Sequence, residues 1–254
     1  LSASWSVQLG SLGGGNHFIE IQKGSDGAVW VMVHSGSRNL GKQVADHYNR
    51  IASTLNMKQG SPVSPAHQLA YLPEQSEEGQ DYIREMNYCV EFAFGNRKLM
   101  MEQIAECFTR NIACSFEPLI NIAHNYARKE RHFGQEVWVH RKGATSAQAG
   151  ETGIIPGSQG AKSYIVTGKG NPESFESCSH GAGRKMGRKE ARRSLDLQAE
   201  IQKMEAQGIV HGIRSAHELD EAPGAYKDIA EVMKQQADLV EIMVELSPLA
   251  AVKG

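Results

Sequence analysis

The sequence reads LGSLGGGNHFIEIQ over residues 9–22 and AVWVMVHSGSRNLG over residues 28–41. Each stretch joins a glycine-rich loop to a short apolar run. The run VWVMV has the length and β-branched content of a buried strand, and it leads into His34. Polar residues at the turns that follow such strands are where sheet proteins commonly place binding and catalytic side chains. The two stretches therefore predict strands whose following turns carry candidate binding and catalytic residues.

Helical patterns follow these strands. Residues 42–55 are predicted to be helical, and residues 60–80, which hold three prolines, are predicted to form a loop. From residue 81 to residue 112 apolar side chains recur mostly at intervals of three or four, which indicates a long amphipathic helix. The simplest role for this helix is that of a scaffold.

The second half of the chain returns to strands and glycine-rich loops between Leu119 and Gly183. Further helices are predicted over residues 189–207 and 225–239, and VEIMVEL at 240–246 reads as a last strand that leads to the C-terminal VKG. The order of these elements predicts an α+β fold with a central mixed or mostly antiparallel sheet flanked by helices.

Composition limits the class of protein. Of the 254 residues, 40% are hydrophobic and 22% are charged, which is typical of a globular protein with a substantial core, and we expect one domain over residues 1–254. The net charge of −2 neither indicates nor excludes a nucleic-acid partner, because a local basic patch suffices for such binding.

The cysteine pattern favours a reducing compartment. Cys89, Cys107, Cys114 and Cys178 form no CxxC pair, and the first three are expected in the helical stretch as small buried residues. We therefore expect a cytoplasmic protein. The sequence has no apolar run of about 18 residues and no basic segment followed by an apolar core near residue 1, so neither a membrane span nor a signal peptide is predicted.

Three of the ten histidines stand out because they lie beside small or polar residues close to apolar runs: His17, His34 and His124. Imidazole is a suitable ligand for Mn, Fe, Zn and Ni, although these spacings match no local zinc motif. A single histidine of this kind is more often a hydrogen-bonded structural residue. Only the surrounding motifs favour metal binding.

Two glycine-rich loops could approach a ligand closely. GGGNHFIE at 13–20 lets the backbone come near a ligand while an amide, an imidazole and a carboxylate face it. GIIPGSQGAKS at 153–163 can present backbone N–H groups to an anion or a base, but it fits a plain tight turn equally well. Neither loop is a GxGxxG or a Walker motif, so Rossmann and P-loop nucleotide binding are not supported.

SCSHGAGRKMGRKEARR at 177–193 sets His180 among small residues and follows it with six basic residues from Arg184 to Arg193. Small neighbours leave room for a bulky adduct. A histidine nitrogen can attack phosphorus, and nearby cations stabilise the charge that develops on phosphoryl oxygens. The basic run alone fits a solvated helical face or a site for RNA phosphates.

Taken together, these segments resemble one enzyme family. In chain order the motifs are GGGNHFIE, HSGSRNLG, AHNYA, VHRKGAT, GIIPGSQGAKSY, SCSHGAGR, DEAPGAYKDI and the terminal VKG. This order is characteristic of the RtcB family of RNA ligases, and the motifs extend from about residue 10 to the last residue. Eight motifs in one order do not coincide by chance, so the resemblance covers nearly the whole chain and implies an RtcB-like catalytic domain.

The resemblance implies an enzyme that uses GTP and two manganese ions. In such a ligase a histidine is guanylylated by GTP, GMP passes to an RNA 3'-phosphate, and a 5'-hydroxyl then displaces GMP. A 2',3'-cyclic phosphate end would first be opened to the 3'-phosphate. The expected partners are RNA ends of these kinds, in tRNA splicing or RNA repair, and an archease-like activator, with no membrane.

By position in the motifs, the resemblance assigns the guanylylated histidine to His180 and the manganese ligands to His17, His34 and His124. These imidazoles should therefore converge, with His180 facing the same cavity. The GMP site that the resemblance implies comprises Asn16, His17, Phe18, Ile19, Glu20, His124, Asn125, Pro156, Gly157, Ser158, Gln159, Ser163, His180, Gly181, Ala182, Gly183 and Lys253. Tyr226 is expected nearby. Candidates for RNA phosphate contacts, on charge and placement alone, are Arg38, Arg141, Lys142, Arg184 and Arg188.

The sequence departs from the family pattern in places. The family carries, upstream of GGGNHF, an Asp and a Cys in a D-x-x-C arrangement that completes the metal site, and none of the four cysteines here has an Asp three residues before it. The chain is then either a fragment of a longer ligase or a degenerate member that would bind metal poorly. Because the sequence starts with Leu1, we expect a fragment that lacks an N-terminal segment of the full-length ligase. Gly187 and Ser146 stand where the family has Ser and Arg, which puts substrate preference in question and leaves the reaction class unchanged.

Two other classes of function fit parts of the pattern. A non-catalytic RNA- or nucleotide-binding module could keep the fold without the chemistry, although the retained histidines oppose this reading. A metal-dependent phosphoesterase could use the same histidines to activate water against a phosphate. Covalent chemistry at His180 separates the ligase from both.

Overall fold

A computed structural model describes residues 6–61 and 64–254. The fold is α+β, as predicted, and the chain divides into two compact units. One unit comprises residues up to Ser11 together with Ser35–Ile112, and the other comprises Leu12–His34 together with Ala113–Gly254. No helix in the described part of the chain has the length and hydropathy needed to cross a bilayer.

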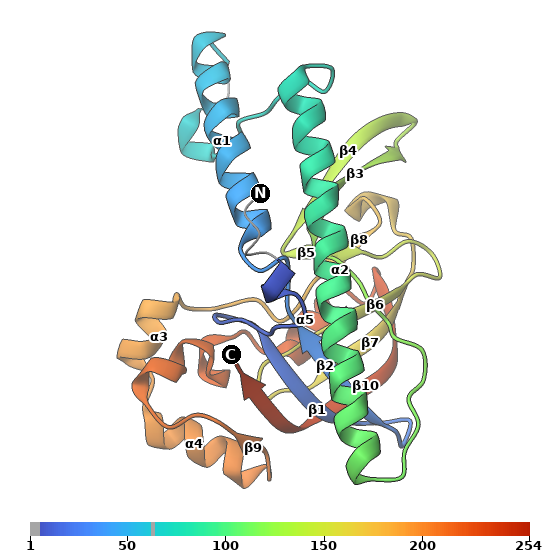
Figure 1. The fold of residues 1–254 in the computed structure, drawn as a ribbon, viewed down its shortest axis with the longest axis vertical. Helices are drawn as coiled ribbons and strands as arrows, with labels where there is room; N and C mark the ends of the chain where they lie inside the picture. The colour runs from blue at the N-terminus through green and yellow to red at the C-terminus, as the bar shows by residue number, and fades with distance from the viewer. Residues whose placement is uncertain (1–5, 62–63) are drawn as a thin grey trace. The chain divides into compact units, whose positions relative to one another are not determined.

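The first unit is helical. Helix α1 spans Leu40–Lys58 and α2 spans Glu77–Asn111, with short 3-10 turns at Ser6–Gln8 and Pro65–His67. Figure 1 shows α1 and α2 as two neighbouring helices, and the rings of Tyr48 and Tyr82 pack between them at 5.3 Å. Both predicted helices are confirmed with longer bounds. Helix α2 starts before residue 81 because the Ser76 side chain accepts a hydrogen bond from the N–H of Gly79. Residues 62–63 of the predicted loop lie outside the described residues.

The second unit is built on the central sheet (Figure 1). Its strands are β1 (Phe18–Gly24), β2 (Val29–His34), β6 (Thr152–Ile155), β7 (Ser163–Gly168), β9 (Val210–His211) and β10 (Val240–Lys253). Their order is β2-β1-β10-β7-β6, all antiparallel, and β9 pairs in parallel with the end of β10. The sheet is therefore mixed and mostly antiparallel, as the sequence predicts.

Two short antiparallel pairs and several short helices complete this unit. The strand pairs are β3 (Asn125–His132) with β4 (Gln135–Lys142), and β5 (Ala144–Ser146) with β8 (Ser177–Ser179). The helices are α3 (Arg188–Ser194), α4 (Leu197–Ala206) and α5 (Ile229–Gln235), with 3-10 turns η3 (Pro172–Ser174), η4 (Ala216–Glu221) and η5 (Pro223–Ala225).

The main core lies on one face of the sheet. Ile229 and Met233 of α5 pack there against Ile155, Tyr164 and Val166. The opposite face carries a second cluster around Met32, Ile165 and Leu246. Because alternate residues of a strand point to opposite faces, the even-numbered residues of β1 belong to the second face.

Three local predictions are wrong. The helix predicted over residues 189–207 is broken into α3 and α4, because the Asp196 side chain caps a new helix by accepting from the N–H of Ala199 at 2.7 Å. The helix predicted over residues 225–239 is only α5, capped by Asp228 after the turn at η5. Cys114 lies beyond the end of α2, and both Cys107 and Cys114 are exposed.

Candidate active site

One row of side chains crosses three strands at the end of the sheet. His34 of β2 lies opposite Phe18 of β1, which lies opposite Lys253 of β10. Residues directly opposite each other in antiparallel strands point to the same face. The rings of Phe18 and His34 are accordingly 5.4 Å apart in an edge-to-face arrangement. The next row on this face holds Glu20, which is only 3% exposed.

Four histidine rings form a continuous series beside this row. The ring centroids of His17 and His34 are 5.8 Å apart, and those of His34 and His124 are 5.4 Å apart. His180 follows at 4.9 Å from His124. These rings come from the residue before β1, the end of β2, the residue before β3 and the residue after β8. All four lie in the second unit, so a single compact body brings them together.

The electrostatics favour neutral imidazole at the centre of this series. The pKa of His34 is lowered to about 3, mainly by burial and in addition by the neighbouring His124, His17, His180 and Lys253. Neutral imidazole is the form that binds metal ions. Burial also lowers the pKa of the Lys253 ammonium, which donates a hydrogen bond to the carbonyl of Gly15 at 2.9 Å.

The donor set suits a metal ion in part. The Nε2 atoms of His34 and His124 are 3.3 Å apart. This separation suits a hydrogen bond, and it equally suits two nitrogens bound to one cation at about 2.1 Å each with an angle of about 100°. Over residues 6–61 and 64–254, however, no three or more His, Cys, Asp or Glu side chains form a group that could hold a metal ion. The metal role of His17, His34 and His124 therefore stays a prediction.

The loops assigned to GMP lie against the histidine loop. The N–H of Ala182 donates to the carbonyl of Pro156 at 3.0 Å, which joins the SHGAG and PGSQ segments. The two segments approach closely at Gly181, where a Cβ would lie 3.1 Å from the Pro156 carbonyl oxygen. The Ser163 hydroxyl accepts from the N–H of Gly157 at 3.2 Å and fixes the PGSQ turn.

Glu20 is joined to this loop through Gln22. The Gln22 amide donates to Glu20 and, at 3.1 Å, to the Ser163 hydroxyl. The pKa of Glu20 is raised to about 8, because the effect of burial exceeds the opposing effect of the hydrogen bond from Gln22. Ile19 lies between Phe18 and Glu20 in β1, so its side chain points to the opposite face of the sheet.

Several buried polar atoms near the loops have no hydrogen-bond partner among the described residues, among them Nδ1 of His180, Oε1 of Gln159 and Oε1 of Gln22. Buried polar atoms are normally paired, and exceptions often mark sites for ligands. Asn16 and Asn125 are exposed. The assigned site thus combines a buried floor with an accessible rim.

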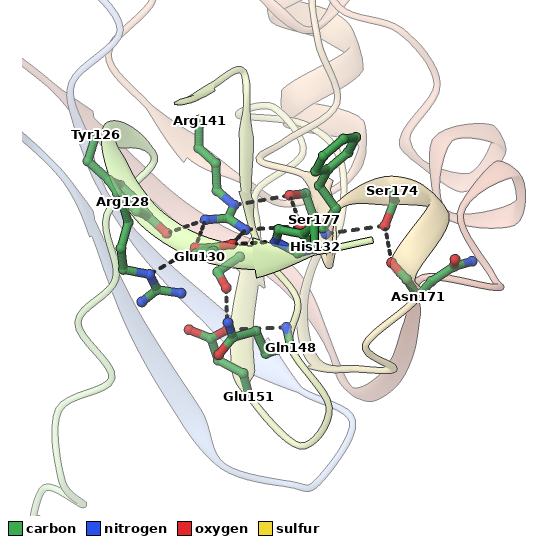
Figure 2. A network of polar contacts seen from close by, with 12 residues as sticks. Tyr126, Arg128, Glu130, His132, Arg141, Gln148, Glu151, Asn171, Ser174 and Ser177 are labelled. Carbon is green, nitrogen blue, oxygen red and sulfur yellow. Dashed lines mark hydrogen bonds and ion pairs between the residues drawn. The ribbon is translucent and has the colours of Figure 1, made fainter. Parts of the chain in front are cut away.

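Arg141 is not an RNA contact, and that prediction is wrong. Its side chain is 1% exposed and binds both carboxylate oxygens of Glu130, at 2.5 and 2.9 Å. Further hydrogen bonds reach the Ser177 hydroxyl and the Phe175 carbonyl. Figure 2 shows this guanidinium inside a network of polar side chains around β3. A buried, paired arginine supports the fold and cannot reach a phosphate in solution.

Sequence reasoning missed Glu221, the last residue of η4. The Glu221 side chain is only 4% exposed. Its carboxylate forms ion pairs with Arg184 at 3.1 Å and with Arg188 at 2.9 Å. Its partner Tyr226 donates a hydrogen bond to the same carboxylate, and the guanidinium of Arg184 lies 5.0 Å from the Tyr226 ring centroid. The available signal was the acidic pair in DEAPGAYKDI, which could compensate the basic run after His180.

The comparisons with known proteins agree on one family. A family model described as "RtcB: tRNA-splicing ligase RtcB" matches residues 1–254. The chain is 44% identical over 253 residues to the RNA-splicing ligase RtcB of Escherichia coli (strain K12), covering 97% of this chain and 61% of that protein. It is 36% identical to the tRNA-splicing ligase RtcB of Thermococcus kodakarensis, covering 97% of this chain and 60% of that protein.

A third relative is the RNA-splicing ligase RtcB of Mycobacterium bovis, which is 35% identical and of which the chain covers 65%. The chain therefore spans about three fifths of the length of the relatives from Escherichia coli and Thermococcus kodakarensis. Because the family model matches all 254 residues, the chain belongs to the RtcB family.

Proposed function

We propose that the protein is an RNA ligase that joins a 3'-phosphate or 2',3'-cyclic phosphate end to a 5'-hydroxyl end, with GTP as the activating nucleotide and His180 as the nucleophile. The observation that carries the proposal is the series of four histidine rings that ends at His180, beside two loops able to enclose a nucleotide. Membership of the RtcB family and the names of the relatives support it.

His180 has surroundings suited to nucleophilic attack. Small residues flank the ring on the chain, and its buried Nδ1 has no partner among the described residues. In the first step an imidazole nitrogen bonds to the α-phosphorus of GTP and the bond to pyrophosphate breaks. In the second step an oxygen of the RNA 3'-phosphate takes the GMP from the histidine. The 5'-hydroxyl then attacks the activated phosphate, and GMP leaves.

The metal part of the proposal assigns His17, His34 and His124 as manganese ligands. The short Nε2 to Nε2 separation of His34 and His124 and the neutral state of His34 support this assignment. Bound manganese would neutralise the triphosphate and polarise the phosphorus that is attacked. The protein itself holds the imidazoles in place through the strand ends and keeps them largely out of water.

Nucleotide recognition is assigned to the PGSQ loop, Glu20 and Lys253. A carboxyl oxygen accepts hydrogen bonds and an ammonium donates them, and guanine presents donors and an acceptor along one edge. Glu20 and Lys253 lie on the same sheet face in neighbouring rows, which supports a joint role. An archease-like activator and the cytoplasm, expected from the resemblance and the cysteine pattern, complete the proposal.

The reaction class is tested by ligation of RNA strands with defined ends. The complete protein is incubated with Mn²⁺, GTP and either a 3'-phosphate with a 5'-hydroxyl or a 3'-hydroxyl with a 5'-phosphate. We expect joining only for the first pair and only with GTP, because an activated phosphate must be on the 3' strand. Release of inorganic phosphate without joining would instead identify a phosphoesterase, and binding without conversion would identify a non-catalytic module.

A further inference from the structure

Glu221 gathers three side chains and one loop around a single buried carboxylate. Its carboxylate accepts hydrogen bonds from Arg188 and Tyr226 and forms an ion pair with Arg184. Its main-chain carbonyl accepts from the Gln159 amide of the PGSQ loop at 3.1 Å. A buried carboxylate without partners is costly, so these contacts hold one another in place. Glu221 therefore links the arginines that follow His180 to the loop assigned to the nucleotide.

The two arginines are used differently. Arg184 makes its contacts inside the protein. It donates hydrogen bonds to the carbonyls of Met186 and Asp220 and to the Tyr226 hydroxyl, and it forms an ion pair with Glu221. Arg188 is held through Nε, and its side chain is 49% exposed. Within residues 6–61 and 64–254 its terminal nitrogens form no hydrogen bond. The guanidinium of Arg188 is thus held through Nε, while its two terminal nitrogens are available to donate hydrogen bonds.

The free end of Arg188 lies over the loop that precedes the histidine series. A Cβ built on Gly15 would be 3.7 Å from Nη2 of Arg188, and Gly15 has a φ of +82°. The carbonyl of the same glycine accepts from Lys253. Arg188 and Lys253 therefore both approach the GGGNH loop. The buried carboxylate of Glu221 pairs with Arg184 and Arg188, and the charges of Glu221 and Asp220 also act on Lys253. The two side chains place positive charge beside this loop, which favours an anion there.

We propose that Glu221 is a positioning residue: by holding Nε of Arg188, it aims the two terminal nitrogens of that guanidinium at the terminal 3'-phosphate of the RNA. Arginine presents two parallel donors that match two phosphate oxygens, provided that the guanidinium plane is fixed. The proposal rests on the proposed function for the identity of the phosphate. It gives the RNA end a binding group distinct from the metal ligands and from His180.

The test is a binding measurement without GTP, so that no chemistry occurs. The complete protein is titrated with two oligoribonucleotides of one sequence, ending in a 3'-phosphate or a 3'-hydroxyl, at a fixed salt concentration. We expect the 3'-phosphate strand to bind about tenfold more tightly, as for one charge-assisted contact. Glu221→Gln keeps the main-chain contact to Gln159 but loses the charge, and should reduce this preference to about twofold or less.

Three further variants separate positioning from a general structural role. Glu200→Gln is the matched control, since Glu200 is a buried glutamate paired with Lys203 and the Gly224 N–H. It should keep the preference. Arg188→Ala should remove it, and Glu221→Gln should add nothing in the Arg188→Ala background, because the two act through one contact. If Glu221→Gln fails to fold, Arg188→Lys tests the role of the guanidinium instead, because lysine keeps the charge but lacks the paired donors. This variant should also lose the preference for the 3'-phosphate strand.

The proposal is overturned if the parent protein shows no preference, if Glu221→Gln or Arg188→Lys keeps it, or if the two substitutions act independently. Formation of the His180 adduct is scored on the same proteins as a separate readout. A preference that depends on Glu221 without any adduct would reject the proposed function and leave the phosphate site standing. An adduct with no effect of Glu221 on the preference would reject this inference alone.

Discussion

Replacement of His180 by alanine is expected to slow the joining of 3'-phosphate and 5'-hydroxyl ends by a factor on the order of 10⁴ or more. Removal of a nucleophile in a covalent mechanism eliminates the step, and losses of this size are typical. His67→Ala is the matched control, because His67 is exposed in the 3-10 turn Pro65–His67 and lies in the other compact unit. Its rate of joining should equal that of the parent protein.

The same variant has a second expected result. An RNA whose 3'-phosphate already carries GMP has passed the two steps that need the histidine nucleophile. His180→Ala should therefore join such an end to a 5'-hydroxyl at a rate within about tenfold of the parent protein. If the variant fails equally with both substrates, His180 supports the structure of the site or the last step, and its role as the acceptor of GMP is wrong.

Replacement of Glu130 by alanine is expected to lower the free energy of unfolding by about 3 to 5 kcal/mol. The substitution leaves Arg141, at 1% exposure, as a buried charge without its carboxylate partner. Figure 2 shows Arg128 and His132 converging on the same carboxylate. Denaturant unfolding measures the change. Glu136→Ala, which breaks the exposed pair with Lys129 at 3.5 Å, is the control and should change stability by about 0.5 kcal/mol or less.

Glu130 also gives stability a defined pH dependence. Burial alone raises the pKa of its carboxyl, but hydrogen bonds from Arg141, His132 and Arg128 outweigh burial and lower the pKa to about 2. The folded state therefore binds fewer protons than the unfolded state between about pH 2 and the ordinary value of 4.5. The stabilisation, about 3 kcal/mol, is complete above pH 4.5 and is lost as the pH falls towards 2. Glu130→Gln should remove this part of the acid dependence, and an unchanged acid profile would contradict the assignment.

The parts of the fold that bury one face regularly were predictable. VWVMV gives β2, and the three-to-four spacing after residue 81 gives α2, because each pattern repeats at the period of its element. VEIMVEL predicts only the first half of β10. The strand continues through Pro248, a residue normally excluded from central strands, and it changes its partner from β7 to β1 at Leu246. The register with β1 shifts beside Pro248: Ile21 pairs with Ala250 and Gln22 with Pro248, so Leu249 of β10 is left without a partner in β1.

The candidate site was predictable only where a motif marked it. The glycine-rich loops and the family resemblance single out four histidines, which the fold brings into one series of rings: His17, His34, His124 and His180. Pairings between distant charges leave no such mark. Arg141 looks like a free cation in VHRKGAT until β3 places Glu130 against it, and Glu221 looks like an ordinary surface acid until η4 places it under Arg188. Such partners depend on long-range packing, which local patterns do not encode.

The central claim is that His180 carries GMP, and peptide mapping tests it most directly. The complete protein is incubated with GTP and Mn²⁺ and digested at neutral to alkaline pH, and its peptides are analysed by mass spectrometry for an acid-labile GMP adduct. We predict the adduct on the peptide that contains His180, with none in His180→Ala. An adduct on the peptide that contains Lys253, or no adduct on any peptide of a protein that joins RNA ends, would contradict the account.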